Sequence, residues 1–482
     1  MEHRRLLLIS HHFPPDTAIG ARRWEKLAHY AAERGLGLDV ITHRDSATPP
    51  NDAERARLDR LPPGVRIFGV VAPPVALARA EQFAWRQLKR MRGRATPAPS
   101  VPSNTASATA PAASQAPAAA RSIPFEEIRW GLTSPRGWMR CYWTWLDIAQ
   151  ARAWGDQVLP VADVVVRAGM GGKRAHVAVV TSGPPHMDHD AGRRVAERTR
   201  LPFVMDMRDP WSIVERLPEA LATPLWSILA RRYERQAVER AALVIANTEL
   251  SCRNLQAVYP HRRGDIITVM NGADDEPLPS PRRGERFVVA HAGTVYLDRD
   301  PRALFQAAAM VIRKLGLTPA QFGLEFIGEL EAVGGFPIRD VANQEGIAEY
   351  VVTGPSRPYA EAMQFMADAA ILVTMSGNNI TAIPAKTFEC IRFDSWVLAL
   401  SAPGSATELL LRGTEADVVA PTDAVGIAEV LERRYRMFSA GTYPVRVAQD
   451  ARFSRTGQAR ILFDALAARL GHGGGGDAPG EQ

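Results

Sequence analysis

Residues 370–411 read AILVTMSGNNITAIPAKTFECIRFDSWVLALSAPGSATELLL, and this stretch decides the fold. Its two short apolar runs, 371–375 and 396–400, are typical of buried parallel strands. After the first run, a loop of small residues leads to Pro384, which fits the first turn of a helix because its missing N–H costs nothing there. After the second run, a Pro-Gly-Ser turn leads to another helix. The alternation of strand, loop and helix indicates a doubly wound α/β sheet.

Polar side chains follow both of these strands. Lys386 and Glu389 are three residues apart, so they share one face of the first predicted helix, and Ser405 begins the second. Doubly wound sheets bind ligands beyond the carboxyl ends of their strands. We therefore expect these three side chains to belong to a binding site.

The string Pro384-x-Lys386-x-x-Glu389 resembles the donor site of the retaining family-4-type glycosyltransferases. Those enzymes have the GT-B architecture, with two Rossmann-like, doubly wound domains facing across a cleft. Their usual pattern has a further Glu seven residues earlier, where this chain has Ala382. In the family the second Glu contacts the nucleotide ribose and the first touches the donor sugar. The resemblance thus implies that Glu389 binds the ribose and that Lys386 acts on the diphosphate.

The composition narrows the class of protein. A length of 482 residues suits two domains, and the 46% hydrophobic and 23% charged residues are those of a globular protein. The net charge of +6 favours an anionic ligand or an acidic membrane surface, although a solvated basic surface gives the same balance. We expect no nucleic-acid partner, because no recognised module or basic stripe occurs.

Cellular location is predicted from the cysteines and the N-terminus. Cys141, Cys252 and Cys390 form no CxxC pair, which favours a reducing compartment and indicates no metal site. The apolar run at 6–9 is too short for a signal-peptide core or a membrane span. We expect a cytoplasmic protein, with weak peripheral association at the inner membrane surface as a further option.

The chain opens with a strand, a loop and a helix, and Gly20 lies at the start of the helix. Helix N-termini attract anions, although a lone glycine is also compatible with a plain helix start. The string SHHFPPDTAIGARRW at 10–24 resembles the opening loop of the family named above. There this glycine lies near the donor diphosphate and the acceptor, so Gly20 is a predicted nucleotide-sugar-binding residue.

Two further motifs end predicted strands. TSGPPH ends at His186, and DMRDPW contains Asp209. They resemble the family strings S-x-P-P-H and D-x-R-D-P-W. A lone His or Asp in a loop is usually structural. Because both motifs end parallel strands, however, we expect His186 and Asp209 to line the active site as catalytic residues.

The second predicted domain begins with a strand at 287–291, followed by Gly293 and Thr294. The family usually has Gly-Arg here and then a Lys, and both cations neutralise the donor phosphates. Thr294 stands at the usual Arg, and Arg299 aligns with the Lys, which keeps the charge and adds a forked donor set. The resemblance therefore implies a phosphate site of Gly293, Thr294 and Arg299 that has one cation fewer, unless Arg302 contributes.

The domain organisation follows from these motifs. We predict an acceptor domain at 1–275 and a nucleotide-sugar domain at 285–445, with a helix at 452–470 crossing back. An Ala/Pro/Ser-rich insertion at 93–122 and a tail at 471–482 are expected to be disordered.

Five tryptophans lie between Trp130 and Trp154. The simplest interpretation is a helix with an aromatic core face. The alternative is a helix at a membrane boundary or on the acceptor side, where Trp and Arg occur together.

The predicted function is that of a retaining hexosyltransferase. It would move a sugar from a nucleotide-sugar to a glycan, lipid or small-molecule acceptor in cell-envelope or exopolysaccharide synthesis. The implied mechanism needs no metal and no cofactor, because fixed cations and helix N-termini stabilise the leaving diphosphate.

Two alternatives remain. The first is another GT-B enzyme, such as a nucleotide-sugar epimerase, which Ala382 allows and the D-x-R-D-P-W string argues against. The second is a non-catalytic relative that assists the assembly of envelope polysaccharide enzymes.

Overall fold

The computed structural model describes residues 4–44, 48–79, 122–124, 135–170, 175–214, 216–218, 221–293, 295, 299–328, 338–377 and 380–471. Almost all of the predicted insertion at 93–122 and of the tail at 471–482 lies outside these residues. By contacts between residues the chain divides into two compact units, 1–244 and 245–482. That division falls inside a strand, and the domain boundary predicted near residue 275 stays a prediction.

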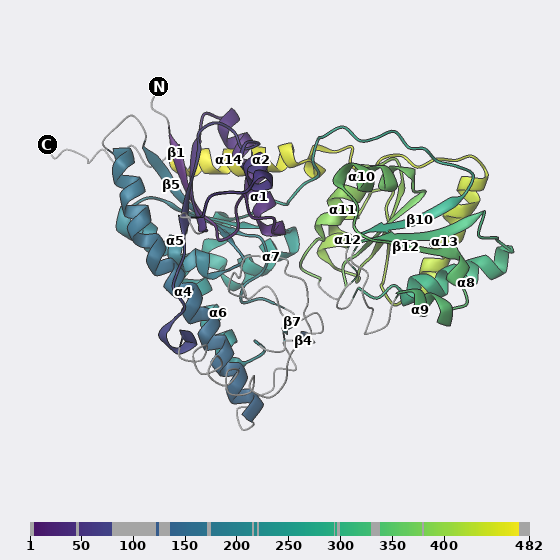
Figure 1. Ribbon diagram of the computed structural model, residues 1–482, viewed down its shortest axis with the longest axis horizontal. Helices are drawn as coiled ribbons and strands as arrows, with labels where there is room; N and C mark the ends of the chain where they lie inside the picture. The colour runs from purple at the N-terminus through teal and green to yellow at the C-terminus, as the bar shows by residue number, and fades with distance from the viewer. Residues whose placement is uncertain are drawn as a thin grey trace, which may run out of the picture. The chain divides into compact units, whose positions relative to one another are not determined.

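The first sheet has seven strands in the order β3-β2-β1-β5-β6-β8-β9 (Figure 1). These are β1 (Arg5–Ile9), β2 (Gly37–His43), β3 (Val65–Val70), β5 (His176–Gly183), β6 (Phe203–Met207), β8 (Leu243–Ala246) and β9 (Ile266–Thr268). From β3 to β6 every neighbouring pair is parallel. Strand order reverses beside β1, which lies between β2 and β5, and such a switch point is where ligands bind in open α/β sheets.

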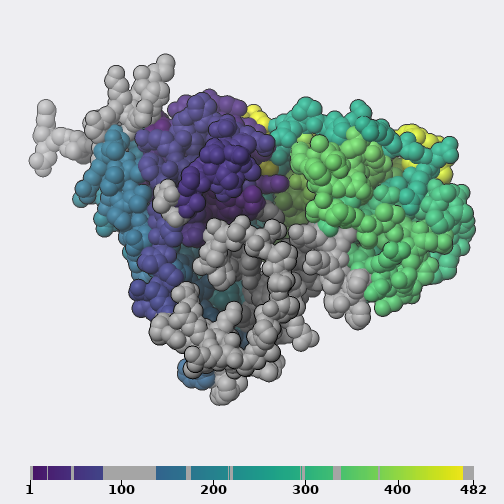
Figure 2. Space-filling model, viewed as in Figure 1, coloured from purple at the N-terminus to yellow at the C-terminus, as the bar shows by residue number. Residues whose placement is uncertain are grey.

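Helices connect and cover these strands. They are α1 (Ile19–Glu33), α2 (Asp52–Leu58), α4 (Pro135–Met170), α5 (Met187–Thr199), α6 (Pro224–Arg240), α7 (Glu249–Val258) and the 3-10 helix η2 (Pro260–Asp265). A separate antiparallel pair joins β4 (Ser122–Pro124) to β7 (Arg216–Pro218). Figure 2 shows the segment up to residue 79, in purple, beside α4, in blue. There the Val75 N–H donates to the Gln150 side chain of α4, 3.0 Å away.

The second sheet has six strands in the order β12-β11-β10-β13-β14-β15, and all neighbouring pairs are parallel. These are β10 (Phe287–Ala292), β11 (Phe322–Ile327), β12 (Val351–Gly354), β13 (Ile371–Met375), β14 (Trp396–Leu400) and β15 (Asp417–Val419). Its helices are α8 (Arg302–Leu315), α9 (Ile338–Gln344), α10 (Tyr359–Asp368), α11 (Ala385–Cys390), α12 (Ala406–Leu411) and α13 (Ala424–Ser439). Two Rossmann-like parallel-sheet domains are therefore confirmed.

The apolar run predicted at 371–375 explains how this second sheet is held. Ile371, Val373 and Met375 belong to one hydrophobic core, whereas Leu372 belongs to the core on the opposite face. Alternate side chains of a strand point to opposite faces, so a strand covered by helices on both sides is apolar on both faces. Thr374 is the exception in this strand, and its buried hydroxyl lies 2.9 Å from that of Thr387. The largely apolar run is thus typical of a central strand.

The last helix, α14 (Arg455–Gly471), follows a short junction between two linking segments. The Ala273 N–H donates to the Phe453 carbonyl over 2.6 Å, and the Arg455 N–H donates to the Ala273 carbonyl over 2.7 Å. Arg455 also pairs with Asp274, with 2.5 Å between Nε and Oδ1. The first linker and the segment that leads into α14 therefore run side by side.

The tryptophan-rich helix requires a correction. Trp154 is buried, but Trp138, Trp143 and Trp145 expose 66%, 42% and 46% of their surface. The interpretation as a helix with an aromatic core face is therefore wrong for these three side chains, while Trp130 lies outside the described residues. In the described part of the chain, no helix combines the length and apolar character needed to cross a membrane.

Candidate functional site

The carboxyl edge of the second sheet is shaped by two glycines. Gly293 follows β10 and Gly328 follows β11, with φ of +157° and +139°. A Cβ on Gly328 would lie only 2.2 Å from the Gly293 carbonyl oxygen. Only glycine adopts this geometry without strain, so the two strand ends approach each other more closely than side chains would allow. The predicted residue Thr294, which comes next, lies outside the described residues.

His291 is a functional candidate that the sequence reasoning missed. It is 4% exposed, and its Nδ1 lies 2.9 Å from the Val373 carbonyl oxygen of β13. Because only an N–H can bond to a carbonyl, the proton is assigned to Nδ1, and Nε2 is left as an acceptor. Among the described residues, that buried Nε2 has no hydrogen-bond partner. Burial, followed by the charges of Arg299 and Lys386, lowers the pKa of His291 to about 4.

The predicted cations gather around this histidine. Arg299 and Lys386 are both close enough for their charges to act on it. The Lys386 Cε lies 3.9 Å from the point that a Cβ on Gly293 would occupy. Lys386 also pairs with Glu389 across one turn of α11, with 2.5 Å between Nζ and Oε2. The structure thus brings Gly293 and Arg299 close to Lys386 and Glu389, although the two pairs lie in distant segments of the sequence.

Ser405 has a local role at the start of α12. Its hydroxyl accepts the Glu408 N–H over 3.2 Å and lies 2.8 Å from the Ser401 hydroxyl, and the residue is fully buried. This is an N-cap, which satisfies a backbone donor at a helix start. Its predicted contact with a nucleotide-sugar stays a prediction.

The first sheet has a second cluster at the ends of β5 and β6, centred on Arg208. A Cβ on Gly20 would lie 2.2 Å from the Arg208 Nη1, so Gly20 makes room for this side chain. Arg208 also donates to the Pro184 carbonyl. Burial lowers its pKa, and Asp209, Asp206 and Asp188 oppose that effect. The D-x-R-D-P-W string contained the signal for Arg208, but sequence reasoning selected only its neighbour Asp209.

His186 and Asp209 both lie beside Arg208. The His186 ring stacks on Trp211, with centroids 5.4 Å apart and planes at 15°. Burial and the Arg208 charge lower the pKa of His186 to about 3, so its ring is neutral at pH 7. Asp209 as a residue is exposed, yet burial of its carboxyl group raises the pKa of that group against the effect of Arg208. Gly20, His186 and Asp209 are therefore brought together in the first sheet.

Two buried carboxylates, those of Asp206 and Asp188, connect the residues around this cluster through hydrogen bonds. Asp206 accepts two hydrogen bonds from the Arg23 guanidinium, both 2.9 Å, and one from the Trp24 indole over 2.8 Å. Asp188 accepts the His11 N–H over 2.7 Å, and burial raises its pKa well above the usual value. Arg23 and Trp24 come from α1 and Asp206 from β6, so the network ties helix to strand beneath the site.

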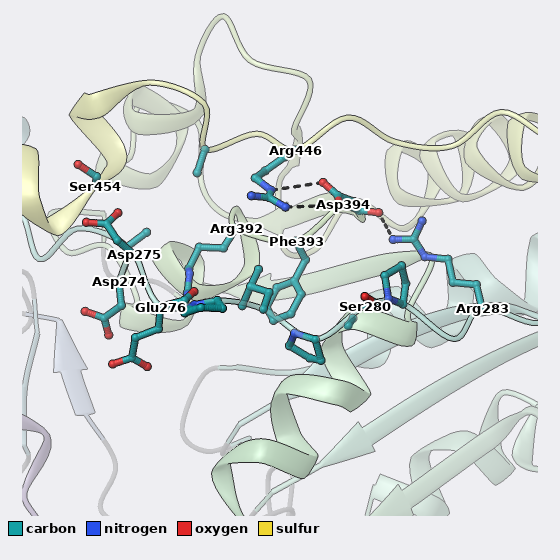
Figure 3. Close-up of a pocket in the computed structure, with 17 residues that line it drawn as sticks. Asp274, Asp275, Glu276, Ser280, Arg283, Arg392, Phe393, Asp394, Arg446 and Ser454 are labelled. Carbon is teal, nitrogen blue, oxygen red and sulfur yellow. Dashed lines mark hydrogen bonds and ion pairs between the residues drawn. The ribbon is translucent and has the colours of Figure 1, made fainter.

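Other polar features carry less chemistry. Within the described ranges, no three His, Cys, Asp or Glu side chains are placed to hold a metal ion. A cavity of about 410 Å³ lies along the linking segments at 273–283 and 446–454. Figure 3 shows two arginines of its lining that contact Asp394 from opposite sides. Arg446 donates to the Asp394 carboxylate, and Arg283 donates to the Asp394 backbone carbonyl. None of the predicted site residues lines this cavity.

The two-domain architecture is similar to that of several solved structures. The chain aligns with a glycosyltransferase from Rickettsia africae at a TM-score of 0.58 and 10% identity, covering 98% of this chain and 99% of that one. The fold is that of the GT-B glycosyltransferases.

Two further GT-B structures show the same likeness. Anabaena HepE in complex with UDP-glucose aligns at a TM-score of 0.53 and 14% identity, covering 96% and 99% of the two chains. Sucrose-phosphate synthase from Thermosynechococcus elongatus aligns at 0.55 and 12%, covering 97% and 99%. No family model matches the sequence. No curated protein matches it either.

Proposed function

We propose that this chain is a glycosyltransferase of the retaining, family-4 type, which uses a nucleotide-sugar and needs no metal or cofactor. The observation that carries the proposal is the cluster of Gly293, Arg299, Lys386 and Glu389 around His291. The cations, the close-packed glycine backbone and the carboxylate match the diphosphate and ribose of one ligand. HepE, whose structure resembles that of this chain, is bound to UDP-glucose, and this supports the same assignment.

Each group then has a role in the transfer. Glu389 accepts hydrogen bonds from the ribose hydroxyls, while Lys386 and Arg299 neutralise the diphosphate. Charge grows on that diphosphate as its bond to the sugar breaks, so fixed cations stabilise the transition state more than the ground state. The acceptor oxygen bonds to the same face of the anomeric carbon, and its proton leaves with the phosphate. Gly20, His186 and Asp209 bind the acceptor side.

The acceptor is proposed to be a glycan, a lipid-linked sugar or a small molecule of cell-envelope or exopolysaccharide synthesis. The reaction would take place in the cytoplasm or at the inner leaflet of the membrane. The chain has more basic than acidic residues, with a net charge of +6, and this excess supports a location near negatively charged groups.

A nucleotide screen tests the proposal. We expect UDP, GDP or ADP to raise the thermal stability of the full chain, by about 2.7 kcal/mol at a hundred times its Kd, because it binds only the folded state. In the presence of an acceptor, the matching nucleotide-sugar should release its nucleoside diphosphate, and NMR of the glycosylated product should show the donor's anomeric configuration. Inversion would contradict retention, and no stabilisation by any nucleotide would contradict the donor site.

Ala382 favours a second candidate, a non-catalytic relative or an epimerase. The residue lies between β13 and α11, where the resemblance implies a carboxylate toward the donor sugar. Nucleotide binding without turnover would support the non-catalytic relative. Conversion of one nucleotide-sugar to its epimer, with the nucleoside diphosphate still attached to the sugar in the product, would support the epimerase.

A further inference from the structure

The first four turns of α4 carry an apolar face that points away from the protein. Trp138, Tyr142, Trp145 and Ala149 recur at the spacing of one helix face, and Met139, Trp143 and Leu146 lie on the adjoining face. Of these, Trp138 and Met139 expose 66% and 59% of their surface, and Trp145 and Trp143 expose 46% and 42%. Figure 1 shows this part of α4 continuing past the end of the sheet.

The polar residues of the same turns lie on the opposite, inner face. Thr144 is fully buried, and its hydroxyl lies 3.2 Å from that of Thr223. Asp147 is partly buried, which raises the pKa of its carboxyl group. Arg140 is half-buried on this side as well. A surface helix of a globular protein has its apolar stripe toward the core, so the polarity here is inverted.

Helix α6 lies against α4 and presents an outward basic face. Besides the contact between Thr144 and Thr223, the Arg152 guanidinium of α4 donates to the Tyr233 hydroxyl over 3.2 Å. At helical spacing, Ile228 is followed by Arg231, Arg232 and Arg235, and all four are exposed. Across the described ranges, no carboxylate forms an ion pair with these three arginines.

We propose that these two faces form a docking surface for an anionic lipid bilayer. The α4–α6 surface consists of Trp138, Met139, Trp143, Trp145, Ile228, Arg231, Arg232 and Arg235. Tryptophan is favoured at the depth of the lipid headgroups, and each arginine near an anionic leaflet adds attraction. A broad apolar face on α4, together with α6 cations for which the described residues supply no ion-pair carboxylate, matches this environment in both respects.

The bilayer fits better than other acidic partners. The only polar groups in the α4 part of the surface are the indole N–H donors of its tryptophans, with no acceptor or charge to pair with the hydrogen-bonding edges of a nucleic acid or a protein chain. An amphipathic helix lying in the headgroup plane needs an apolar face and nearby cations, and it does not need to span the membrane. The inference does not depend on the proposed sugar transfer, because it rests on α4 and α6 alone.

Sedimentation of the full chain with vesicles tests the inference. We expect binding to vesicles of phosphatidylglycerol and phosphatidylcholine at low salt, and much weaker binding to phosphatidylcholine alone or at high salt. Replacing Arg231, Arg232 and Arg235 by Gln should weaken binding to the anionic vesicles roughly a hundredfold. Replacing Trp138, Trp143 and Trp145 by Ser should weaken it at least about tenfold.

Matched variants control for charge and exposed apolar area. Arg313, Arg339 and Arg460 are exposed on other helices, and their replacement by Gln makes the same change in net charge. Tyr359 and Tyr443 expose 51% and 61% of their surface, and their replacement by Ser removes exposed rings elsewhere. Both control variants should bind anionic vesicles like the wild type.

Three results would overturn the inference. These are no binding to anionic vesicles at low salt, an equal loss of binding in the arginine control, and full binding by the tryptophan variant. A change in the sedimenting mass of the protein alone, abolished by the tryptophan variant without any effect on vesicle binding, would assign the surface to self-association. Circular dichroism checks folding. Release of the nucleoside diphosphate in the presence of a soluble acceptor should be the same in all variants. A failure of the proposed sugar transfer can therefore be told apart from a failure of membrane binding.

Discussion

The carboxyl edges of the two sheets are built differently. At the first, Asp206 and Asp188 already have protein partners, and Arg208 is surrounded by carboxylates. At the second, the buried Nε2 of His291 has no hydrogen-bond partner among the described residues, and Lys386 pairs with Glu389 at a half-buried position. The first edge also holds buried ring nitrogens without such a partner, on His186 and His189, so the difference lies in its network of paired carboxylates. Substitutions that disturb this network should reduce stability, and those at the second edge should reduce binding and turnover.

Lys386→Met gives the largest expected effect. We expect kcat to fall roughly 10²- to 10³-fold, because a fixed cation that meets developing charge is lost. Nucleotide affinity and stability should change little, since a partly exposed ion pair contributes under about 1 kcal/mol. Lys314 pairs with Glu432 on the outer helices, with 2.7 Å between Nζ and Oε2, so Lys314→Met is a matched control. Steady-state kinetics decides, and an unchanged kcat would remove Lys386 from the mechanism.

Glu389→Ala should act on affinity. A carboxylate that accepts hydrogen bonds from ribose contributes about 1.5–3 kcal/mol, so the Kd for the nucleoside diphosphate should rise roughly tenfold to a hundredfold. Calorimetry measures this, and Glu432→Ala provides the matched loss of a paired carboxylate. Unchanged affinity with an intact fold would show that Glu389 only pairs with Lys386.

Gly20→Ala tests the first edge. The new methyl group would lie 2.2 Å from the Arg208 Nη1, inside a packed cluster, so the free energy of unfolding should fall by about 1–3 kcal/mol. Gly264→Ala is the control, because no atom lies within 4 Å of its added Cβ. Urea unfolding compares the two. Equal stability would mean that Arg208 is free to shift and that the edge is less rigid than its contacts indicate.

His291→Asn tests the second edge through pH. The folded-state pKa of about 4 is below the ordinary value of 6.5, so the unfolded chain binds the proton first as the pH falls. His291 should therefore contribute a decrease in wild-type stability below pH 6.5, of roughly 1 kcal/mol between pH 7 and 5.5. His186, His189 and His11 also have lowered pKa values, so the Asn variant should lose only the His291 share of the total decrease. The exposed His261→Asn should retain all of it. Parallel unfolding curves for wild type and His291→Asn would contradict a buried, neutral His291.

Much of this organisation could be predicted from the sequence. The strands at 371–375 and 396–400 were expected and are found, because apolar periodicity records burial directly. The partners of His291 could not be predicted, since Val373 comes from a distant strand and the sheet order brings them together.

The orientation of α4 shows the same limit. The sequence shows a tryptophan-rich helix, but its buried side depends on α5 and α6, which follow later in the chain. Local patterns therefore predict the elements, whereas the polar contacts and the exposed faces depend on how those elements meet.

The junction at Ala273 and Phe453 has a consequence for modularity. Because these residues are hydrogen-bonded neighbours, the chain between them leaves and returns at one point. Residues 276–451 are thus attached in the manner of an inserted domain, whose two ends could be joined by a short turn. A recombination event that exchanged this segment for another would need to preserve only the spacing of two backbone strands. Donor choice could in this way change during evolution without any change in the first sheet.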